Sequence, residues 1–247
     1  MNMDNKKSRF EIAVNPFIRI AGGKALAIGL AGMLLSAIVA ISGDVHYHGL
    51  LHYGPAVNNA WWTPAVEVLA VWLVPAVLFY LGGRLRSKSQ IRAVDVFGTV
   101  AFAQIPLLVV NLLMITPPMQ QMAELAIDAN NIGQLLADHQ LLVRSTLMTL
   151  LQIPFIVLML LWMAMAVKVS CNLKSWALVV VYAVGIIGGD ILSRIVISYI
   201  VESEYCLISG SVVVASRLVP QSNRCLMASA DTTVSFCGSR TVCRSHI

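Results

Sequence analysis

The chain has 247 residues, of which 58% are hydrophobic and only 12% are charged. Soluble domains carry roughly 25% charged residues, so this composition excludes an ordinary soluble protein. The net charge of +5 comes from basic residues in short stretches between apolar runs. That distribution is typical of membrane orientation and argues against nucleic-acid binding.

Residues 1–24 form a basic N-terminal segment, with five Lys or Arg against two acidic residues. Apolar side chains are interspersed among these charges, so the segment is predicted to be cytoplasmic and to lie along the membrane surface. A disordered basic tail is the alternative. The apolar run that follows is too long, and begins too late, for a cleaved signal peptide.

Five apolar runs are long enough to cross a bilayer, because about 20 helical residues span the roughly 30 Å hydrocarbon core. The central run, from Val96 to Ile115, has twenty residues without a charge. The sequence therefore predicts an all-α polytopic membrane protein. The five spans are expected at about residues 25–42, 65–83, 96–115, 146–167 and 176–201.

Small residues and prolines indicate how these spans pack. Gly185 and Gly189 form a GxxxG step in the fifth span, which favours close helix contact. Prolines inside a helix remove one backbone hydrogen bond and favour a kink. Kinks are predicted at Pro75, Pro106 and Pro154.

The charge of the connections predicts the orientation. The N-terminal segment and the second and fourth connections hold five, four and two Lys or Arg, whereas the first and third hold none and one. Positive charge favours the cytoplasmic side. The N-terminus is therefore expected in the cytoplasm and the C-terminus outside.

Polar residues inside the spans are the first candidate site, because intramembrane polar groups need partners or a polar path. Two QIP steps, containing Gln104 and Gln152, occur in spans three and four. We expect these amides to bond each other or the carbonyls that the neighbouring prolines free. Asp190 and Arg194 lie four residues apart and are expected to pair. The intramembrane polar candidates are Gln104, Asn111, Gln152, Asp190 and Arg194.

A histidine-rich stretch in the first connection, GDVHYHGLLH, is the second candidate site. Imidazole binds zinc, copper or nickel, so His46, His48 and His52 are candidate metal ligands. No HExxH arrangement accompanies them, and an interfacial position is the alternative. Glu67 is interpreted as a first-turn carboxylate that interacts with the helix dipole.

Two further segments lie outside the spans. The third connection, residues 117–145, is expected to contain an amphipathic helix with Met119, Met122 and Ala126 on one side. The tail, residues 202–247, is atypical, is expected outside the cytoplasm and is predicted to be poorly ordered. A module tied by disulfides among its four cysteines is the alternative.

Three blocks of the chain resemble the Yip family of five-span membrane proteins. They are DVFGTVAFAQIPLL, the QIP of span four, and AVKVSCNLKSWALVVVYAVGIIGGDILSRI. With NPFIRIAGGKALAIGLAG near the N-terminus, the chain resembles the bacterial branch. Eukaryotic members interact with Rab-type GTPases, but their long N-terminal region is missing here, so GTPase binding is not expected.

The resemblance implies a cytoplasmic N-terminus and no catalytic site. We therefore expect a non-enzymatic interaction or organising protein of a bacterial inner membrane, without a cofactor. Its partners would be the lipid bilayer and other membrane proteins or a second copy. A small transporter or channel with a polar path through spans three to five is one alternative. A metal-binding membrane enzyme that uses the first-connection histidines is the other.

Overall fold

The computed structural model describes residues 15–55, 60–87, 89–127 and 131–218, with side chains as far as Ile200. It confirms the predicted fold class, since five helical segments are long and apolar enough to cross a membrane. The chain divides into two compact units, Met1–Ser203 and Glu204–Ile247, and all five segments lie in the first. The spanning helices are α2 (Gly22–Ser42), α3 (Thr63–Arg86), α4 (Ala93–Ala103) with α5 (Pro106–Met114), α8 (His139–Ser170) and α9 (Ser175–Leu218).

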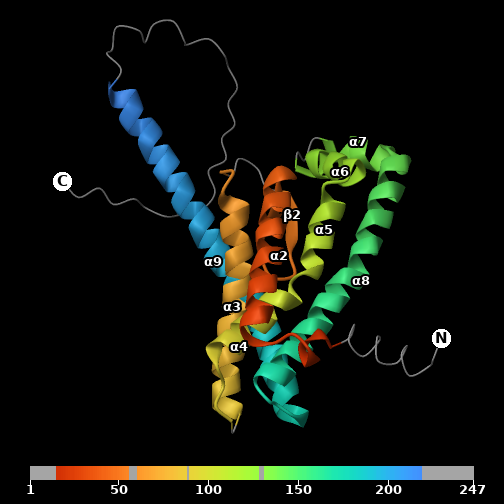
Figure 1. Ribbon diagram of the computed structural model, residues 1–247. Helices are drawn as coiled ribbons and strands as arrows, with labels where there is room; N and C mark the ends of the chain where they lie inside the picture. The colour runs from red at the N-terminus through yellow and green to blue at the C-terminus, as the bar shows by residue number, and fades with distance from the viewer. Residues whose placement is uncertain (1–14, 56–59, 88, 128–130, 219–247) are drawn as a thin grey trace, which may run out of the picture. The chain divides into compact units, whose positions relative to one another are not determined.

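The connections also contain regular structure. A short 3-10 turn, η1 (Pro16–Ile18), precedes α2, and strands β1 (Val45–Tyr47) and β2 (Tyr53–Pro55) lie between α2 and α3. The third connection forms α6 (Pro117–Ile127) and α7 (Ile132–Ala137), which lie between the ends of α5 and α8 (Figure 1). We call this end, where the strands and α6 also lie, the hairpin end of the bundle. A helix is thus present in the third connection, with Met119 buried and Met122 half-buried, but Ala126, predicted on the same side, is exposed.

Pro106 interrupts the third span rather than only bending it. The α4 helix ends at Ala103, and α5 begins at Pro106 after a tight turn. The proline leaves the Phe102 carbonyl without its usual partner one turn later. The Ile105 N–H donates to that carbonyl at 3.1 Å, so the break satisfies itself locally. Pro75 and Pro154, in contrast, lie inside the continuous helices α3 and α8.

The closest helix packing is between α2 and α4, where glycine allows the two backbones to approach. A Cβ atom at Gly29 would lie 2.5 Å from the Phe102 nitrogen, and one at Gly98 would lie 2.8 Å from the Gly22 carbonyl oxygen. Any larger residue would force the helices apart. Ser36 and Ala40 continue the buried side of α2 toward the hairpin end.

The predicted GxxxG step of the fifth span packs against α3. A Cβ atom at Gly185 would overlap the Phe79 ring, and one at Gly189 would lie 3.1 Å from Pro75. Gly82 of α3 receives Val181 of α9 in the same way, at 2.9 Å. The two helices therefore interlock through glycines on both sides.

The spans expose many large apolar side chains. On α9, Val184, Ile187, Ile191 and Ile195 are 61%, 63%, 52% and 58% exposed. A soluble protein does not expose such a contiguous apolar ridge, whereas in a membrane this ridge faces acyl chains. The exposure pattern is that of an integral membrane protein.

The helix of the fifth span extends past the predicted start of the tail at residue 202, since the backbone of α9 is helical as far as Leu218. The remaining tail and the side chains of its four cysteines lie outside the described residues, as do residues 1–14 of the predicted N-terminal segment.

Candidate functional site

The first connection folds into a β-hairpin, which the sequence analysis did not predict. His46 pairs with Gly54 and Tyr47 with Tyr53 across the two antiparallel strands. The His48 N–H donates to the His52 carbonyl at 2.8 Å and closes the turn. Tyr47 and Leu50 are only 2% and 1% exposed, so the hairpin is inserted into its end of the bundle. We call residues 44–55 the inserted hairpin.

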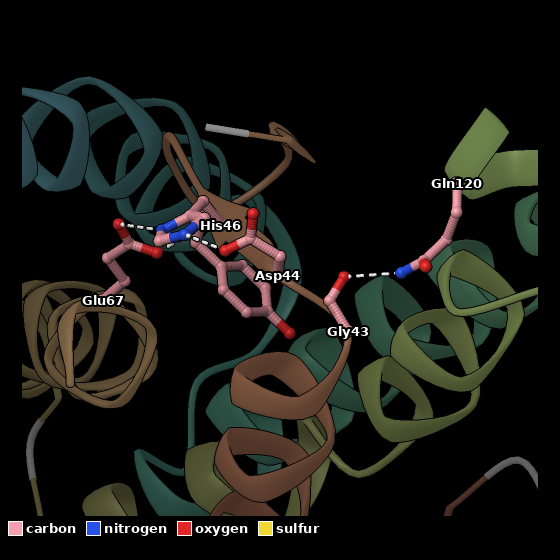
Figure 2. A network of polar contacts seen from close by, with 6 residues as sticks. Gly43, Asp44, His46, Glu67 and Gln120 are labelled. Carbon is pink, nitrogen blue, oxygen red and sulfur yellow. Dashed lines mark hydrogen bonds and ion pairs between the residues drawn. The ribbon is translucent and has the colours of Figure 1, made fainter. Parts of the chain in front are cut away.

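His46 lies between two carboxylates. Its Nδ1 is 3.0 Å from Glu67 Oε1, and its Nε2 is 3.3 Å from Asp44 Oδ1 (Figure 2). The second oxygen of Glu67 accepts a bond from the Tyr47 N–H at 2.8 Å. His46 and Glu67 are 1% and 3% exposed, whereas the Asp44 side chain is largely exposed. Glu67 therefore anchors the hairpin to α3, which corrects its interpretation as a residue that mainly serves the helix dipole.

This geometry favours the charged form of His46. Only an imidazolium can donate from both ring nitrogens, and here each nitrogen faces a carboxylate oxygen. Burial lowers the pKa of His46, but the hydrogen bonds and negative charges of Glu67 and Asp44 outweigh burial and raise the pKa above 6.5. A buried carboxylate is costly without a positive partner, and His46 supplies that partner to Glu67.

Tyr47 carries the hairpin into contact with two more spans. Its hydroxyl donates to Asn111 Oδ1 of α5 at 2.9 Å. The Asn111 amide nitrogen lies 2.7 Å from Ser36 Oγ and 3.3 Å from the Ser36 carbonyl oxygen of α2. Burial raises the pKa of the Tyr47 phenol to about 12, so it remains a donor at any ordinary pH. Asn111 is fully buried, and both the oxygen and the nitrogen of its amide have hydrogen-bond partners.

Tyr53, opposite Tyr47 in the hairpin, bonds to the fourth span. Its hydroxyl donates to Gln152 Oε1 of α8 at 2.8 Å. The Gln152 amide nitrogen is 3.4 Å from Met114 Sδ, and Gln152 is only 2% exposed. The two hairpin tyrosines thus use the polar side chains of spans three and four as anchors.

The turn of the hairpin is held by the fifth span. Asp190 Oδ1 accepts from the Leu51 N–H at 2.9 Å, and Asp190 Oδ2 forms the predicted ion pair with Arg194 at 2.7 Å. A guanidinium nitrogen of Arg194 also lies 3.4 Å from His52 Nδ1. A Cβ atom at Gly49 would lie 2.8 Å from Asp190 Oδ1 and 2.9 Å from Arg194 Cγ, so a larger residue there would displace this ion pair.

Gln104 has a different role from the other intramembrane polar residues. Its amide nitrogen donates to the Val71 carbonyl of α3 at 3.0 Å. Pro75 cannot donate to that carbonyl, because Val71 is four residues before it and proline has no N–H. Gln104 was expected to bond Gln152 or a carbonyl freed by the neighbouring proline of its own QIP step. Its partner is instead the carbonyl that Pro75 of span two frees, so the prediction is wrong for Gln104.

Gln104 and Gln152 also do not bond each other, because Gln152 bonds Tyr53 and Met114. The polar side chains of the transporter alternative do not gather along one path. Gln104 bonds α3, Asn111 and Gln152 bond the two hairpin tyrosines, and Asp190 pairs with Arg194. The cavity beside Gln104 and Tyr47 has a volume of about 10 Å³. That is room for one water molecule at most.

The structure does not form the candidate metal site. Within residues 15–55, 60–87, 89–127 and 131–200, no three His, Cys, Asp or Glu side chains are placed to hold a metal ion. His46 is committed to two carboxylates, His48 is exposed on the surface of the turn, and His52 faces Arg194. Cys171, the only cysteine whose side chain is described, is buried and free, and burial raises the pKa of its thiol.

Sequence reasoning missed the hairpin residues that complete the site. Ser36, Tyr47, Leu51 and Tyr53 were not candidates, although they supply the partners of the polar side chains inside the spans. A signal was present: HYHGLLHY repeats His and Tyr on both sides of a central glycine, as paired strands joined by a turn would. The short run and the strong helical pattern on both sides conceal it.

The structure is that of an integral membrane protein with five helical spans and an inserted hairpin. The hairpin bonds directly to α3, α5, α8 and α9, and Asn111 links it to α2. Comparison with protein-family models, with curated proteins and with solved structures finds no match to this chain.

Proposed function

We propose that this chain is a non-enzymatic interaction or organising protein of the Yip type, embedded in a bacterial inner membrane with its N-terminus in the cytoplasm. One observation carries the proposal. The polar side chains inside the spans are bonded to the inserted hairpin or to a helix carbonyl, and so serve the fold. The blocks that resemble the Yip family, around Gln104 and Asp190, contain several of these side chains.

The network is a poor substrate path. A transport site leaves donors and acceptors for a substrate, which then exchanges with water. Asn111 and Gln152 instead have protein partners at both ends of their amides. The transporter alternative would require the hairpin to leave the bundle and break at least the Tyr47 and Tyr53 bonds together.

The network is also a poor catalytic centre. A general base needs a nitrogen that can reach a substrate or water, and both nitrogens of His46 face carboxylate oxygens in a buried position. The hairpin therefore supports a structural role of His46, which is to stabilise Glu67.

The lipid-facing surface is one surface through which a membrane protein can contact another. We propose that one of the exposed apolar faces of the spans contacts another membrane protein or a second copy. Such contacts depend on close packing, because lipid tails and side chains are equally apolar.

The test is photo-crosslinking in native membranes. A photoreactive residue is placed singly at four exposed positions on four spans, at Leu34, Leu81, Leu151 and Ile187. We expect a discrete protein adduct from at least one face and lipid adducts from the others. Buried Val110 is the matched control and should crosslink only within the chain.

Two results would contradict the proposal. One is the absence of a protein adduct from all four faces. The other is solute flux in proteoliposomes that is abolished by Gln152→Leu while the fold is retained, which would establish the transporter alternative.

A further inference from the structure

Arg144 is a basic residue of the third connection, at the hairpin end of the bundle. The two connections at that end, residues 43–63 and 117–145, contain no other Lys or Arg. The Arg144 side chain is exposed, and no carboxylate of the described residues lies within ion-pair distance of it. A cation in these two connections opposes the charge asymmetry between the connections of the chain, which suggests that it has a local partner.

The position of Arg144 along α8 matches the lipid headgroup layer. The apolar part of this span, residues 146–167, has 22 residues and extends about 33 Å at 1.5 Å per residue. That length fills the roughly 30 Å hydrocarbon core. Arg144 is two residues beyond the apolar part, about 3 Å of helix. Phospholipid phosphates lie in this layer.

A polar recess lies beside Arg144. It has a volume of about 330 Å³ and is lined by the start of α6 and the start of α8, with Pro117, Gln121, Asp138, Gln140 and Arg144 among its residues. The recess thus carries one positive and one negative side chain, together with two amides. Asp138 also caps α8, since one of its oxygens accepts from the Leu141 N–H at 3.0 Å.

An apolar surface continues from the recess along α8 toward the bilayer centre. Leu147, Leu150 and Leu151 follow Arg144 within two helical turns and are 58%, 55% and 49% exposed. Val143, in the turn that contains Arg144, is 45% exposed. A polar recess followed along the helix by an apolar surface is complementary to a phospholipid, which has a polar headgroup followed by acyl chains.

We propose that this recess binds the headgroup of a phosphoethanolamine lipid in the leaflet at the hairpin end. Arg144 binds the phosphate, Asp138 accepts from the primary ammonium group, and the leucines of α8 contact the acyl chains. Asp138 disfavours an anionic headgroup by repulsion. A choline headgroup lacks the N–H donors that a carboxylate binds best. Free phosphate would leave the apolar face without a partner.

The experiment uses the full chain, purified in detergent and stripped of lipid. Phosphoethanolamine, phosphocholine and phosphoglycerol lipids with identical acyl chains are titrated separately, and bound lipid is counted by native mass spectrometry. We expect one phosphoethanolamine lipid to bind with preference over the other two classes. Arg144→Gln should weaken that binding about tenfold or more, as loss of a charge-assisted bond predicts.

Two variants separate charge from structure. Asp138→Asn keeps a residue that caps a helix N-terminus equally well but removes the negative charge. It should abolish the preference over phosphocholine while leaving the protein folded. Lys174→Gln removes an exposed cation at the opposite end of the bundle and should change neither the lipid affinity nor the headgroup preference.

The proposal is overturned if Arg144→Gln binds the phosphoethanolamine lipid as tightly as the parent protein. It is equally overturned if the parent protein binds all three headgroup classes alike, which would indicate annular lipid only, or if it prefers the anionic lipid. Retention of the headgroup preference in Asp138→Asn would remove Asp138 from the site and refute the proposed recognition of the ammonium group.

Discussion

His46 and Glu67 show how a membrane span can hold a buried carboxylate through a partner in a hairpin. Glu67 lies one turn into α3 and is almost completely buried, yet both of its oxygens have hairpin partners. Removing one member of a buried ion pair leaves an uncompensated charge and typically costs about 3–5 kcal/mol. At the residue scale, the hairpin position therefore depends on the protonation of one imidazole.

We predict that the protein loses stability as the pH rises through the neutral range. The folded pKa of His46 is raised above 6.5, so its contribution is complete below pH 6.5 and disappears as the pH passes the raised value. The measurement is the thermal unfolding temperature in detergent from pH 5 to pH 9, compared between the parent protein and His46→Gln. The variant should show a lower unfolding temperature at acidic pH and a smaller dependence on pH.

His48→Gln is the matched control, because His48 lies in the same hairpin but is exposed. It should reproduce the parent profile. An unfolding temperature of His46→Gln that equals the parent value at pH 5 would show that the imidazolium does not stabilise the hairpin.

At the scale of elements, glycines decide how closely the helices pack. We predict that Gly29→Ala is strongly destabilising, because its Cβ would lie 2.5 Å from a backbone atom of Phe102, and a backbone cannot rotate away. Overpacking of this kind costs about 1–3 kcal/mol or more. Gly23→Ala in the same helix is the control, since nothing lies within 4 Å of its Cβ position. Unfolding temperatures measured in one detergent compare the two, and equal values would contradict the close packing of α2 on α4.

The second prediction for the elements concerns the hydrogen bond from Gln104, between α4 and α5, to the Val71 carbonyl of α3. Gln104→Leu should destabilise the protein by about 0.6 kcal/mol, and by about 1.7 kcal/mol at most, the range for intramembrane side-chain bonds. In a Pro75→Ala background the effect should shrink, because the substituted alanine has an N–H that can donate to the Val71 carbonyl. The measurement is a double-mutant cycle of unfolding free energies. Additive effects would show that Gln104 does not replace the bond that Pro75 removes.

At the scale of the whole molecule, the inserted hairpin joins the spans into one unit. Hydrogen bonds run from residues 46–53 to α3, α5, α8 and α9, which are far apart in the sequence. Each span also exposes apolar side chains outward. The buried core is mainly apolar, as in a soluble domain, and the difference lies at the surface, where apolar side chains are also exposed.

The orientation of the whole molecule is the final prediction. Reporter fusions ending at Ser89 or Lys174 should indicate the cytoplasm, because Lys and Arg are concentrated in those connections. A fusion ending at Asn131 should indicate the opposite side. A cytoplasmic signal at Asn131 would contradict the proposed orientation and would also move the Arg144 recess to the other leaflet.

The sequence alone determines the class and the span positions of this protein. Long uncharged runs have few alternatives to membrane helices, because a backbone in hydrocarbon must satisfy its own hydrogen bonds. Local rules also predict the Asp190–Arg194 pair and the packing of Gly185 and Gly189, since each depends on spacing within one helix.

Only the tertiary structure decides what the polar residues do. Glu67, Asn111, Gln152 and Asp190 are each compatible with a substrate path when read singly, and their partners lie 20 to 139 residues away in the chain. The inserted hairpin brings those partners together, and its formation depends on the cavity that the assembled helices leave for it. A hydrogen bond between distant residues has no local pattern, so spacing predicts that these groups need partners but not which partners they have.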